Sequence, residues 1–333
     1  MISIKDLARI AGVSPSTISR AVNGKKYVKP EIRERILELV KETGYVPNNA
    51  ARSMVLKRTF TVGIVIPDTF NMFQRQLFST IERSLEGFGY RTLFLFVKWE
   101  PESELACLRR LKAEKLDGII MLHEVTHPSF YAYLAEGSVP VVLCTFSREG
   151  SGFPAVHVDE EAAARAATGY LIGLGHRNIG LISGSHFSFG AQRARGYRAA
   201  LAEAGIAPDE GRIVFVPSYT PEDGRAGMRT LLRQNTGLSA VFAATDELAI
   251  GAVRALYEAG LAVPGDVSVV GFDDIDISAY LAPALTTIRQ PILEMGRKTA
   301  ELMSRSIADE NDVDGAAVFG HELVVRESSA PLR

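Results

Sequence analysis

The first 24 residues constrain the fold most strongly, because they contain two short amphipathic segments that meet at a glycine. Ser3 and Asp6 have the spacing of a helix-capping box, and Gly12 ends the helix that they begin. Ser14 can cap a second helix with Pro15 in its first position, where the missing N–H costs nothing. Two short helices joined in this way predict a helix-turn-helix. In that motif the second helix enters the major groove of DNA with its N-terminal residues facing the bases.

Pro15, Ser16 and Arg20 would face base edges in such a motif. A plainer interpretation is that the segment starts an ordinary helix and that Arg20 is a solvated charge. The charge distribution favours DNA binding, because residues 1–59 carry 12 Lys and Arg against 5 Asp and Glu, and the rest of the chain carries 25 against 34. A basic segment in a chain of net charge −2 is typical of a phosphate-binding head.

A third helix is expected from Pro30 to Thr43, with Gly44 as its terminator. It completes a compact three-helix head over residues 1–47. Residues 48–58 contain helix formers but almost no apolar face, and they are too few for a stable isolated helix. They are therefore either a plain linker or a hinge that becomes helical when something packs against it.

From residue 59 onward, short apolar runs alternate with helical patterns. Continuous apolar strands separated by helices predict parallel sheets that are covered on both faces. Eight such strands fall into two groups, and one more is expected near the end of the chain. The expected strands are 62–66, 92–97, 118–122, 139–143, 178–182, 213–216, 240–243, 267–270 and 322–325.

The predicted fold is therefore an all-α helix-turn-helix head followed by an α/β body of two doubly wound parallel-sheet lobes. We assign residues 59–158 and 290–320 to an N-terminal lobe, and residues 159–289 and 321–333 to a C-terminal lobe. Ligands of such sheets bind outside the carboxyl ends of the strands, so two facing lobes predict a cleft at those ends.

The composition argues against several other classes of protein. Cys107 and Cys144 are far apart and form no C-x-x-C pair, so neither a disulfide framework nor a cysteine zinc site is indicated. The chain begins with a capped helix rather than a signal peptide, and no apolar run approaches the roughly 20 residues that span a bilayer. We expect a cytoplasmic protein with no membrane partner, no cofactor and no metal. The lack of leucine heptads near the C-terminal end favours a dimer over a tetramer.

Several segments in a fixed order carry a family resemblance. They are Ile4 to Asn23, Tyr45-Val-Pro-Asn48, Gly175-His-Arg-Asn-Ile-Gly180, Arg193-Ala-Arg-Gly-Tyr197, Thr245-Asp-Glu-Leu-Ala-Ile-Gly251, Val269-Val-Gly-Phe-Asp-Asp274 and Leu285-Thr-Thr-Ile288. With them the chain resembles the LacI/GalR family of bacterial transcription repressors over essentially its whole length. The resemblance implies a homodimer that binds a pseudo-palindromic DNA operator and has a body like a periplasmic sugar-binding protein. It also implies a small polar effector, such as a sugar, whose binding in the cleft controls operator affinity; the effector's identity, and whether it induces or co-represses, stay open.

The resemblance also implies which residues contact DNA. Pro15, Ser16 and Arg20 hold the base-reading positions, and Arg20 is expected to supply most of the direct readout, with a preference for guanine. Asn48 begins the hinge, and Met54 stands where the family inserts an apolar wedge, usually leucine, into the central base step. The implied phosphate contacts are Thr17, Ser19, Asn23 and Tyr27.

Five residues match effector contacts of the family: Phe73, Arg193, Tyr219, Thr245 and Asp273. Arg193 matches an arginine that grips hydroxyls or carboxylates, and Asp273 matches an acidic ligand of the effector. Tyr219 matches an aromatic that stacks on the effector, and Phe73 is expected in the first strand-to-helix connection. Thr245 stands where asparagine is common, which weakens the case for a simple hexose. Each of these residues could instead be a helix cap or a core aromatic.

One motif suggests different chemistry, because His123-Glu-Val-Thr-His127 fits the H-E-x-x-H signature of zinc metalloproteases. That signature requires a helix, which brings both histidines to one face. Here His123 directly follows an apolar strand and Pro128 follows His127, so a loop is expected, in which His123 or Glu124 could contact an effector. A dinucleotide-dependent enzyme is disfavoured because no G-x-G-x-x-G opens a helix after a strand. A transport binding protein should carry a signal peptide and no basic head.

Overall fold

The computed structural model describes residues 2–22, 28–45, 58–68, 71–137, 139–184, 188–235, 237–309 and 315–332. The chain divides into two compact units, Met1–Thr59 and Phe60–Arg333. The expected domain limits at 47/48 and 58/59 fall within or next to residues outside the described ranges, and they stay predictions.

The first unit contains the three expected helices, α1 (Ile4–Ala11), α2 (Pro15–Val22) and α3 (Pro30–Thr43). The Ser3 side chain accepts a hydrogen bond from the Asp6 N–H while the Asp6 carboxylate accepts one from the Ser3 N–H, which confirms the capping box. Gly12 ends α1 with a φ of 68°, a left-handed conformation that favours glycine. One apolar cluster joins the helices; its buried members are Leu7, Ala8, Ala11, Ile18, Ala21 and Ile36.

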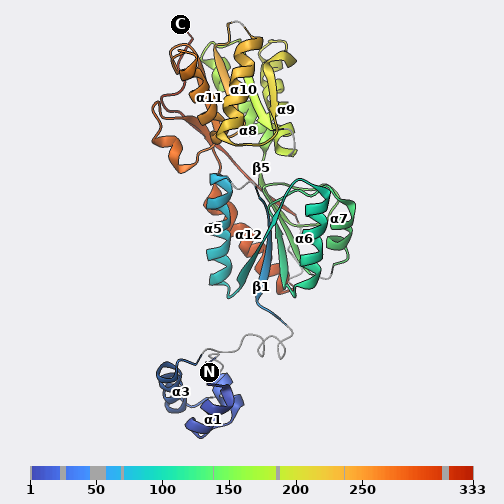
Figure 1. Ribbon diagram of the computed structural model, residues 1–333, viewed down its shortest axis with the longest axis vertical. Helices are drawn as coiled ribbons and strands as arrows, with labels where there is room; N and C mark the ends of the chain where they lie inside the picture. Colours follow the sequence, from blue (N-terminus) through green and yellow to red (C-terminus); the bar gives the residue numbers. More distant parts are fainter. Residues whose placement is uncertain are drawn as a thin grey trace. The chain divides into compact units, whose positions relative to one another are not determined.

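The first lobe of the second unit is built on a six-stranded sheet with the order β11-β5-β4-β3-β1-β2 and only parallel pairs. Helices α5 (Met72–Gly87) and α12 (Ile292–Ile307) pack together on one face, and α6 (Pro101–Ala113) and α7 (Pro128–Ala135) lie on the other (Figure 1). The strands are β1 (Thr61–Pro67), β2 (Arg91–Val97), β3 (Gly118–Met121), β4 (Val141–Cys144), β5 (Ala155–Val158) and β11 (Ala316–Phe319). Their apolar side chains form separate cores on the two faces, as the continuous apolar runs predict.

The second lobe has a sheet of the same size with the order β12-β10-β9-β8-β6-β7. Helix α8 (Glu160–Gly173) packs against α9 (Ser188–Glu203), and α10 (Pro221–Gln234) packs against α11 (Asp246–Glu258). The strands are β6 (Ile179–Gly184), β7 (Ile213–Val216), β8 (Ala240–Ala243), β9 (Ser268–Asp273), β10 (Thr286–Arg289) and β12 (Glu322–Val324). The sequence analysis predicts a purely parallel sheet. The edge strand β12 is antiparallel to β10, so that prediction is wrong for this strand.

The sequence analysis misses three strands, β5, β10 and β11, because none of them is a long apolar run. The four residues of β10 begin with Thr286 and Thr287, which are both fully buried. Their hydroxyls are satisfied inside the lobe: Thr286 lies 2.8 Å from the Ser329 hydroxyl, and Thr287 donates to Asp246 over 2.5 Å. A buried strand can therefore be polar when every hydroxyl has a partner.

The missed strands matter because the chain passes between the lobes after β5, after β10 and between β11 and β12. Asp274 lies beside two of these crossings, where it accepts hydrogen bonds from Arg289 over 2.7 Å and from Arg326 over 2.6 Å. Arg289 also forms an ion pair with Glu322 over 2.9 Å. These contacts anchor the loop that carries Asp274.

Candidate functional site

Helix α2 presents a polar face on the first unit. Ile18 and Ala21 are buried against the other helices, while Pro15, Ser16 and Arg20 are exposed on the opposite face. Ser16 and Arg20 are four residues apart, so their side chains project in the same direction. Ser14 accepts a hydrogen bond from the Thr17 N–H over 3.2 Å, which confirms it as the helix cap. The three expected base-reading side chains therefore lie together on the surface.

The expected phosphate contacts are only partly described. The Thr17 hydroxyl lies 2.9 Å from the Ser14 hydroxyl, and both Thr17 and Ser19 are partly buried at the edge of the polar face. The remaining predicted DNA contacts, Asn23, Tyr27, Asn48 and Met54, lie outside the described residues. The roles of all these residues stay predictions.

Arg193 is the centre of a buried charged cluster at the carboxyl ends of the second lobe's strands. Its side chain is 3% exposed, and its Nε donates to Glu160 Oε2 over 2.7 Å. Its Nη1 donates to the carbonyl of Ala244, directly after β8, and its Nη2 lies 3.9 Å from Asp273 Oδ1. The ring of Phe272 covers one face of the guanidinium, whose carbon lies 3.6 Å from the ring centroid. Burial opposes the charge of Arg193, but Glu160 and Asp273 raise its pKa above the ordinary value.

Asp273 ends β9 in a backbone conformation that is rare for a residue with a side chain, at a φ of 119°. Such a conformation costs about 1–3 kcal/mol and persists where the surroundings hold it. The carboxylate is 4% exposed and accepts a hydrogen bond from Gln290 Nε2 over 2.8 Å. Burial raises the pKa of Asp273 well above 3.8, and Arg193 only partly offsets that effect. The cluster thus holds one cation beside two carboxyl groups.

Tyr219 forms the aromatic side of this cluster. It precedes α10, is 7% exposed, and its ring lies 5.0 Å from the ring of Phe189 on α9. The chain leaves room for it with two glycines, because a Cβ on Gly184 would lie 2.3 Å from the Tyr219 ring and one on Gly190 would lie 2.6 Å from its hydroxyl. Burial raises the pKa of Tyr219 above its usual range. The structure therefore places an aromatic side chain beside Arg193, and its stacking on an effector stays a prediction.

Two other predicted effector contacts have structural roles. Thr245 caps α11, since its hydroxyl accepts a hydrogen bond from the Leu248 N–H over 3.2 Å. Phe73 lies in the first turn of α5 and not in the preceding connection, because the helix begins at Met72. Its side chain is 7% exposed and belongs to the core of the first lobe. Contact of either residue with an effector stays a prediction.

The H-E-x-x-H motif lies in the loop between β3 and α7, which confirms the expected loop. Its two histidines serve different purposes: His123 is fully buried with its ring 4.2 Å from that of Trp99, and His127 accepts a hydrogen bond from the Ser129 N–H as the cap of α7. The buried Glu104 carboxylate holds the loop by accepting from the N–H groups of Thr126 and His127. Among the described residues, no group of His, Cys, Asp and Glu could hold a metal ion.

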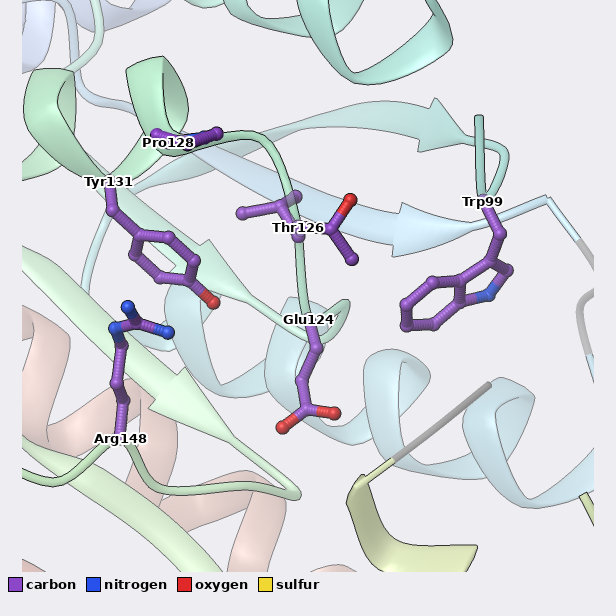
Figure 2. A pocket seen from close by; sticks show the side chains of 7 residues that line it. Trp99, Glu124, Thr126, Pro128, Tyr131 and Arg148 are labelled. Atoms are coloured by element: carbon purple, nitrogen blue, oxygen red, sulfur yellow. The ribbon is translucent and has the colours of Figure 1, made fainter. Parts of the chain in front are cut away.

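A cavity of about 490 Å³ opens beside this loop, at the carboxyl ends of the first lobe's strands. Figure 2 shows the Glu124 carboxylate between Trp99 on one side and the stacked pair of Tyr131 and Arg148 on the other. The second Glu124 oxygen, Oε2, accepts a hydrogen bond from the N–H of Ser188, the first residue of α9 in the second lobe, over 2.9 Å. Val125, Thr126 and Pro128 complete the lining.

The sequence analysis did not identify the partners that complete these sites. Glu160 follows β5 and Gln290 follows β10. Because the sequence analysis missed both strands, it could not place either residue at the carboxyl end of a strand. Trp99 follows β2, an expected strand, and its position at a carboxyl end was a usable signal. Arg148 lies four residues beyond β4 in a loop. Because a loop has no regular periodicity, the position of Arg148 in the sequence does not indicate where its side chain points.

Comparisons with known proteins agree with this architecture. Residues 3–48 match the model of bacterial regulatory proteins of the lacI family, and residues 168–329 match that of the periplasmic binding protein-like domain. Catabolite control protein A from Priestia megaterium is 33% identical over 334 residues, which cover 98% of this chain and 99% of the relative. The helix-turn-helix unit and the two-lobed unit together define a DNA-binding transcriptional regulator. The chain belongs to the LacI family.

Two solved structures resemble the whole chain. The transcriptional regulator CelR in complex with cellobiose is 31% identical, with a TM-score of 0.76, over 99% of this chain and 100% of that one. The lac repressor dimer bound to operator and the anti-inducer ONPF is 25% identical, with a TM-score of 0.88, over 99% of both chains. In the part of the chain that the structure describes, no helix is both long and apolar enough to cross a membrane.

Proposed function

We propose that this regulator is a homodimeric repressor in the cytoplasm, whose operator affinity is controlled by an uncharged sugar or related polyol. The effector binds at the carboxyl ends of the second lobe's strands, beside Arg193, Asp273 and Tyr219. The chain acts by binding rather than by catalysis, in line with the regulators that it resembles.

The polar face of α2 supports the DNA-binding half of the proposal. Ser16, in the first turn of α2, and Arg20, in its last turn, project together from a helix whose opposite face is buried. An exposed arginine can bind guanine through two hydrogen bonds, whereas a serine hydroxyl accepts or donates to several bases. The lac repressor binds its operator as a dimer, and a homodimer would present two such faces to the half-sites of a palindrome.

The buried cluster around Arg193 is the observation that carries the effector half. Glu160 already neutralises the guanidinium at 2.7 Å, and Asp273 adds a second carboxyl group at 3.9 Å. An anionic effector would therefore meet a site with no surplus positive charge. Hydroxyl groups fit better, because they can donate to the Asp273 carboxylate and accept from the Gln290 amide. The CelR complex contains such a ligand, cellobiose.

The test measures operator affinity of the full chain with and without neutral sugars. A preferred DNA duplex is first selected from a random pool, and binding is followed by fluorescence anisotropy in the presence of single sugars and their phosphate esters. We expect at least one neutral sugar to shift the operator Kd tenfold or more, while its phosphate ester has a much smaller effect. A response to phosphate esters alone, or to no sugar at all, would contradict the proposed effector class.

Asp273→Asn tests the site with little change of shape. The amide keeps one oxygen acceptor but loses the charge, so the sugar's effect on operator affinity should fall about tenfold while sugar-free DNA binding stays within about twofold. Asp276→Asn is the matched control, because Asp276 is exposed after the same strand. If the sugar changes operator affinity equally in the two variants, the effector does not bind beside Asp273.

A further inference from the structure

The two lobes contact each other on both faces of the body, and the contacts on the two faces differ in kind. Helices α5 and α12 of the first lobe and α10 and α11 of the second cover apolar cores that are separate from those under α6, α7, α8 and α9. Figure 1 shows α5 and α11 on one side of the body and α6 and α9 on the other. We call these sides the α5–α11 face and the α6–α9 face.

An apolar side chain and a hydrogen bond join the lobes on the α5–α11 face. Ile275 follows β9 of the second lobe, but it is 2% exposed and belongs to the apolar cluster that α5 and α12 form on the first lobe's sheet. Ile250 of α11 packs against the same cluster. Beside them, Glu247 of α11 accepts a hydrogen bond from the Met72 N–H, at the start of α5, over 3.0 Å. Separating the lobes on this face would break that bond and expose Ile275 to water, which is unfavourable.

Asp246 holds the loop that carries Ile275. It begins α11, its carboxylate is fully buried, and Oδ2 accepts hydrogen bonds from the Ile275 N–H over 2.9 Å and from the Ser278 hydroxyl over 2.6 Å. Oδ1 accepts a hydrogen bond from the Thr287 hydroxyl over 2.5 Å. The carboxylate also fills the space beside Gly271 of β9, where a Cβ would lie 2.3 Å from Oδ1. Donors from the loop and from β10 therefore fix Ile275 to the first turn of α11.

The α6–α9 face has a weaker contact. The Ser188 N–H donates to Glu124 Oε2 over 2.9 Å, and both residues are partly exposed. In the part of the chain that the structure describes, neither the apolar cluster under α6 and α7 nor that under α8 and α9 includes a side chain from the other lobe. A hydrogen bond that water can replace contributes little net free energy, so this contact can open at little cost.

We propose that the two lobes pivot on the first turn of α11 and separate on the α6–α9 face, with Asp246 as the positioning residue of the pivot. Separation in this direction breaks the bond between Glu124 and Ser188 but leaves Ile275 buried and the bond between Glu247 and Met72 intact. Separation in the opposite direction would lose the apolar contact and the more enclosed bond together. The proposal concerns the chain without a ligand, so it does not depend on the class of the effector.

Amide hydrogen exchange measures the two contacts directly. Met72 begins α5 and Ser188 begins α9, and the first N–H groups of a helix have no acceptor within it, so exchange at each amide reports the inter-lobe bond. The full chain without ligand is measured by mass spectrometry that resolves single amides. We expect exchange to be slowed by about 100-fold or more at Met72 and by less than about tenfold at Ser188. Equal protection of the two amides would overturn the pivot.

Two variants weaken the pivot in different ways. Ile275→Ala removes the apolar contact, and Glu247→Ala removes the acceptor without changing the core of either lobe, which keeps the test valid if Ile275→Ala does not fold. Each should speed exchange at Met72 about tenfold and leave Ser188 within about twofold. Glu124→Ala is the matched control, because it removes the carboxylate of the other face and should leave Met72 unchanged. If either pivot variant speeds exchange equally at both amides, the lobes separate as a whole and the pivot does not exist.

Asp246→Asn tests the positioning role. The amide keeps the size of the carboxylate but offers one acceptor oxygen to three donors, so exchange at Ile275 and at Met72 should rise about fivefold while Ser188 stays unchanged. Asp276→Asn is the control, since Asp276 is exposed in the same loop and its variant should leave all three amides unchanged. A rise at Ile275 alone, or an equal rise at all three amides, would show that Asp246 does not position the pivot.

Discussion

Arg193 and Arg148 both lie at the carboxyl ends of parallel strands, but they differ in almost every other respect. Arg193 is 3% exposed, paired with Glu160 and covered by the ring of Phe272. Arg148 is exposed and rests on Tyr131 with its outer edge open to a cavity. The first arginine is enclosed by charged and aromatic partners of the protein, whereas the second lines an open cavity.

The difference shows that position at a strand end does not by itself make an arginine a ligand-binding residue. A buried guanidinium must be neutralised within the fold, so its donors are largely occupied before any effector arrives. Such a residue orients the carboxyl groups around it. An exposed guanidinium that stacks on an aromatic ring keeps its donors free at little cost.

The largest effect is expected from removing the buried arginine. Arg193→Met leaves Glu160 and Asp273 without their cation in a buried site, and loss of one partner of a buried pair typically costs 3–5 kcal/mol. We expect a loss of about that size in the unfolding free energy, measured by urea denaturation and circular dichroism. A loss below about 1 kcal/mol would show that the cluster is solvated and would remove the contrast with Arg148.

The double variant Arg193→Met with Glu160→Gln sharpens this test. Removing the negative partner as well should recover about 0.5–3 kcal/mol of the loss, because interacting residues do not contribute additively. If the double variant is as unstable as the sum of the single variants, Glu160 and Arg193 do not act as a pair.

A second prediction is that acid changes the contributions of two buried groups, one in each lobe, to the unfolding free energy in opposite directions. Burial lowers the pKa of His123 in the first lobe to about 4, so the unfolded chain binds more protons than the folded chain between pH 4 and 6.5. His123 therefore lowers the unfolding free energy as the pH falls through that window. In the second lobe, burial raises the pKa of Asp246 to about 7, so its contribution to stability grows as the pH falls from 7 toward 4.

His123→Leu separates the two effects. A difference of about 2.5 pKa units corresponds to about 3 kcal/mol, so the variant should gain that amount relative to the unsubstituted protein between pH 6.5 and pH 4. The measurement is the difference in unfolding free energy at several pH values. A difference that does not change with pH would mean that the histidine is accessible to protons in the folded lobe.

The third prediction extends the comparison to an arginine of the first unit. Arg20 is exposed on the same face of α2 as Ser16, so its donors are available to a base. Arg20→Ala should weaken binding of the selected operator by about 1–3 kcal/mol and relax the preference at one base pair in each half-site. Arg9→Ala is the control, because Arg9 forms an ion pair with Asp6 on α1. Equal weakening on all sequences would instead identify Arg20 as a phosphate contact.

The fold was predictable where the sequence uses strong local signals. The head follows from a capping box, a left-handed glycine and a proline at a helix start, all of which act within a few residues. The central strands follow from continuous apolar runs. The strands β5, β10 and β11 could not be identified, because they are short and their stability comes from tertiary partners such as the hydroxyl contacts of Thr286 and Thr287.

The candidate site was predictable only where a motif marks it. Arg193, Asp273 and Tyr219 lie together as the family resemblance implies, but no pattern indicates that Glu160 neutralises Arg193 across 33 residues of chain. The same limit applies to Trp99, whose contact with His123 joins two separate loops. Pairing between buried groups depends on three-dimensional packing, and a single sequence does not encode it in any local signal.

The smallest effect is expected from Arg148, and it completes the comparison. Arg148→Met removes a charge that is exposed and has no carboxylate partner in the described chain, so the loss is confined to its contact with the Tyr131 ring and hydroxyl, worth about 0.5–1 kcal/mol at an exposed site. A methionine over the same ring restores part of this through sulfur–aromatic contact. The unfolding free energy, followed by Trp99 emission in urea, should therefore stay within about 0.5 kcal/mol. A loss of more than 2 kcal/mol would make Arg148 a structural residue like Arg193, and the cavity would then have no donors to spare for a ligand.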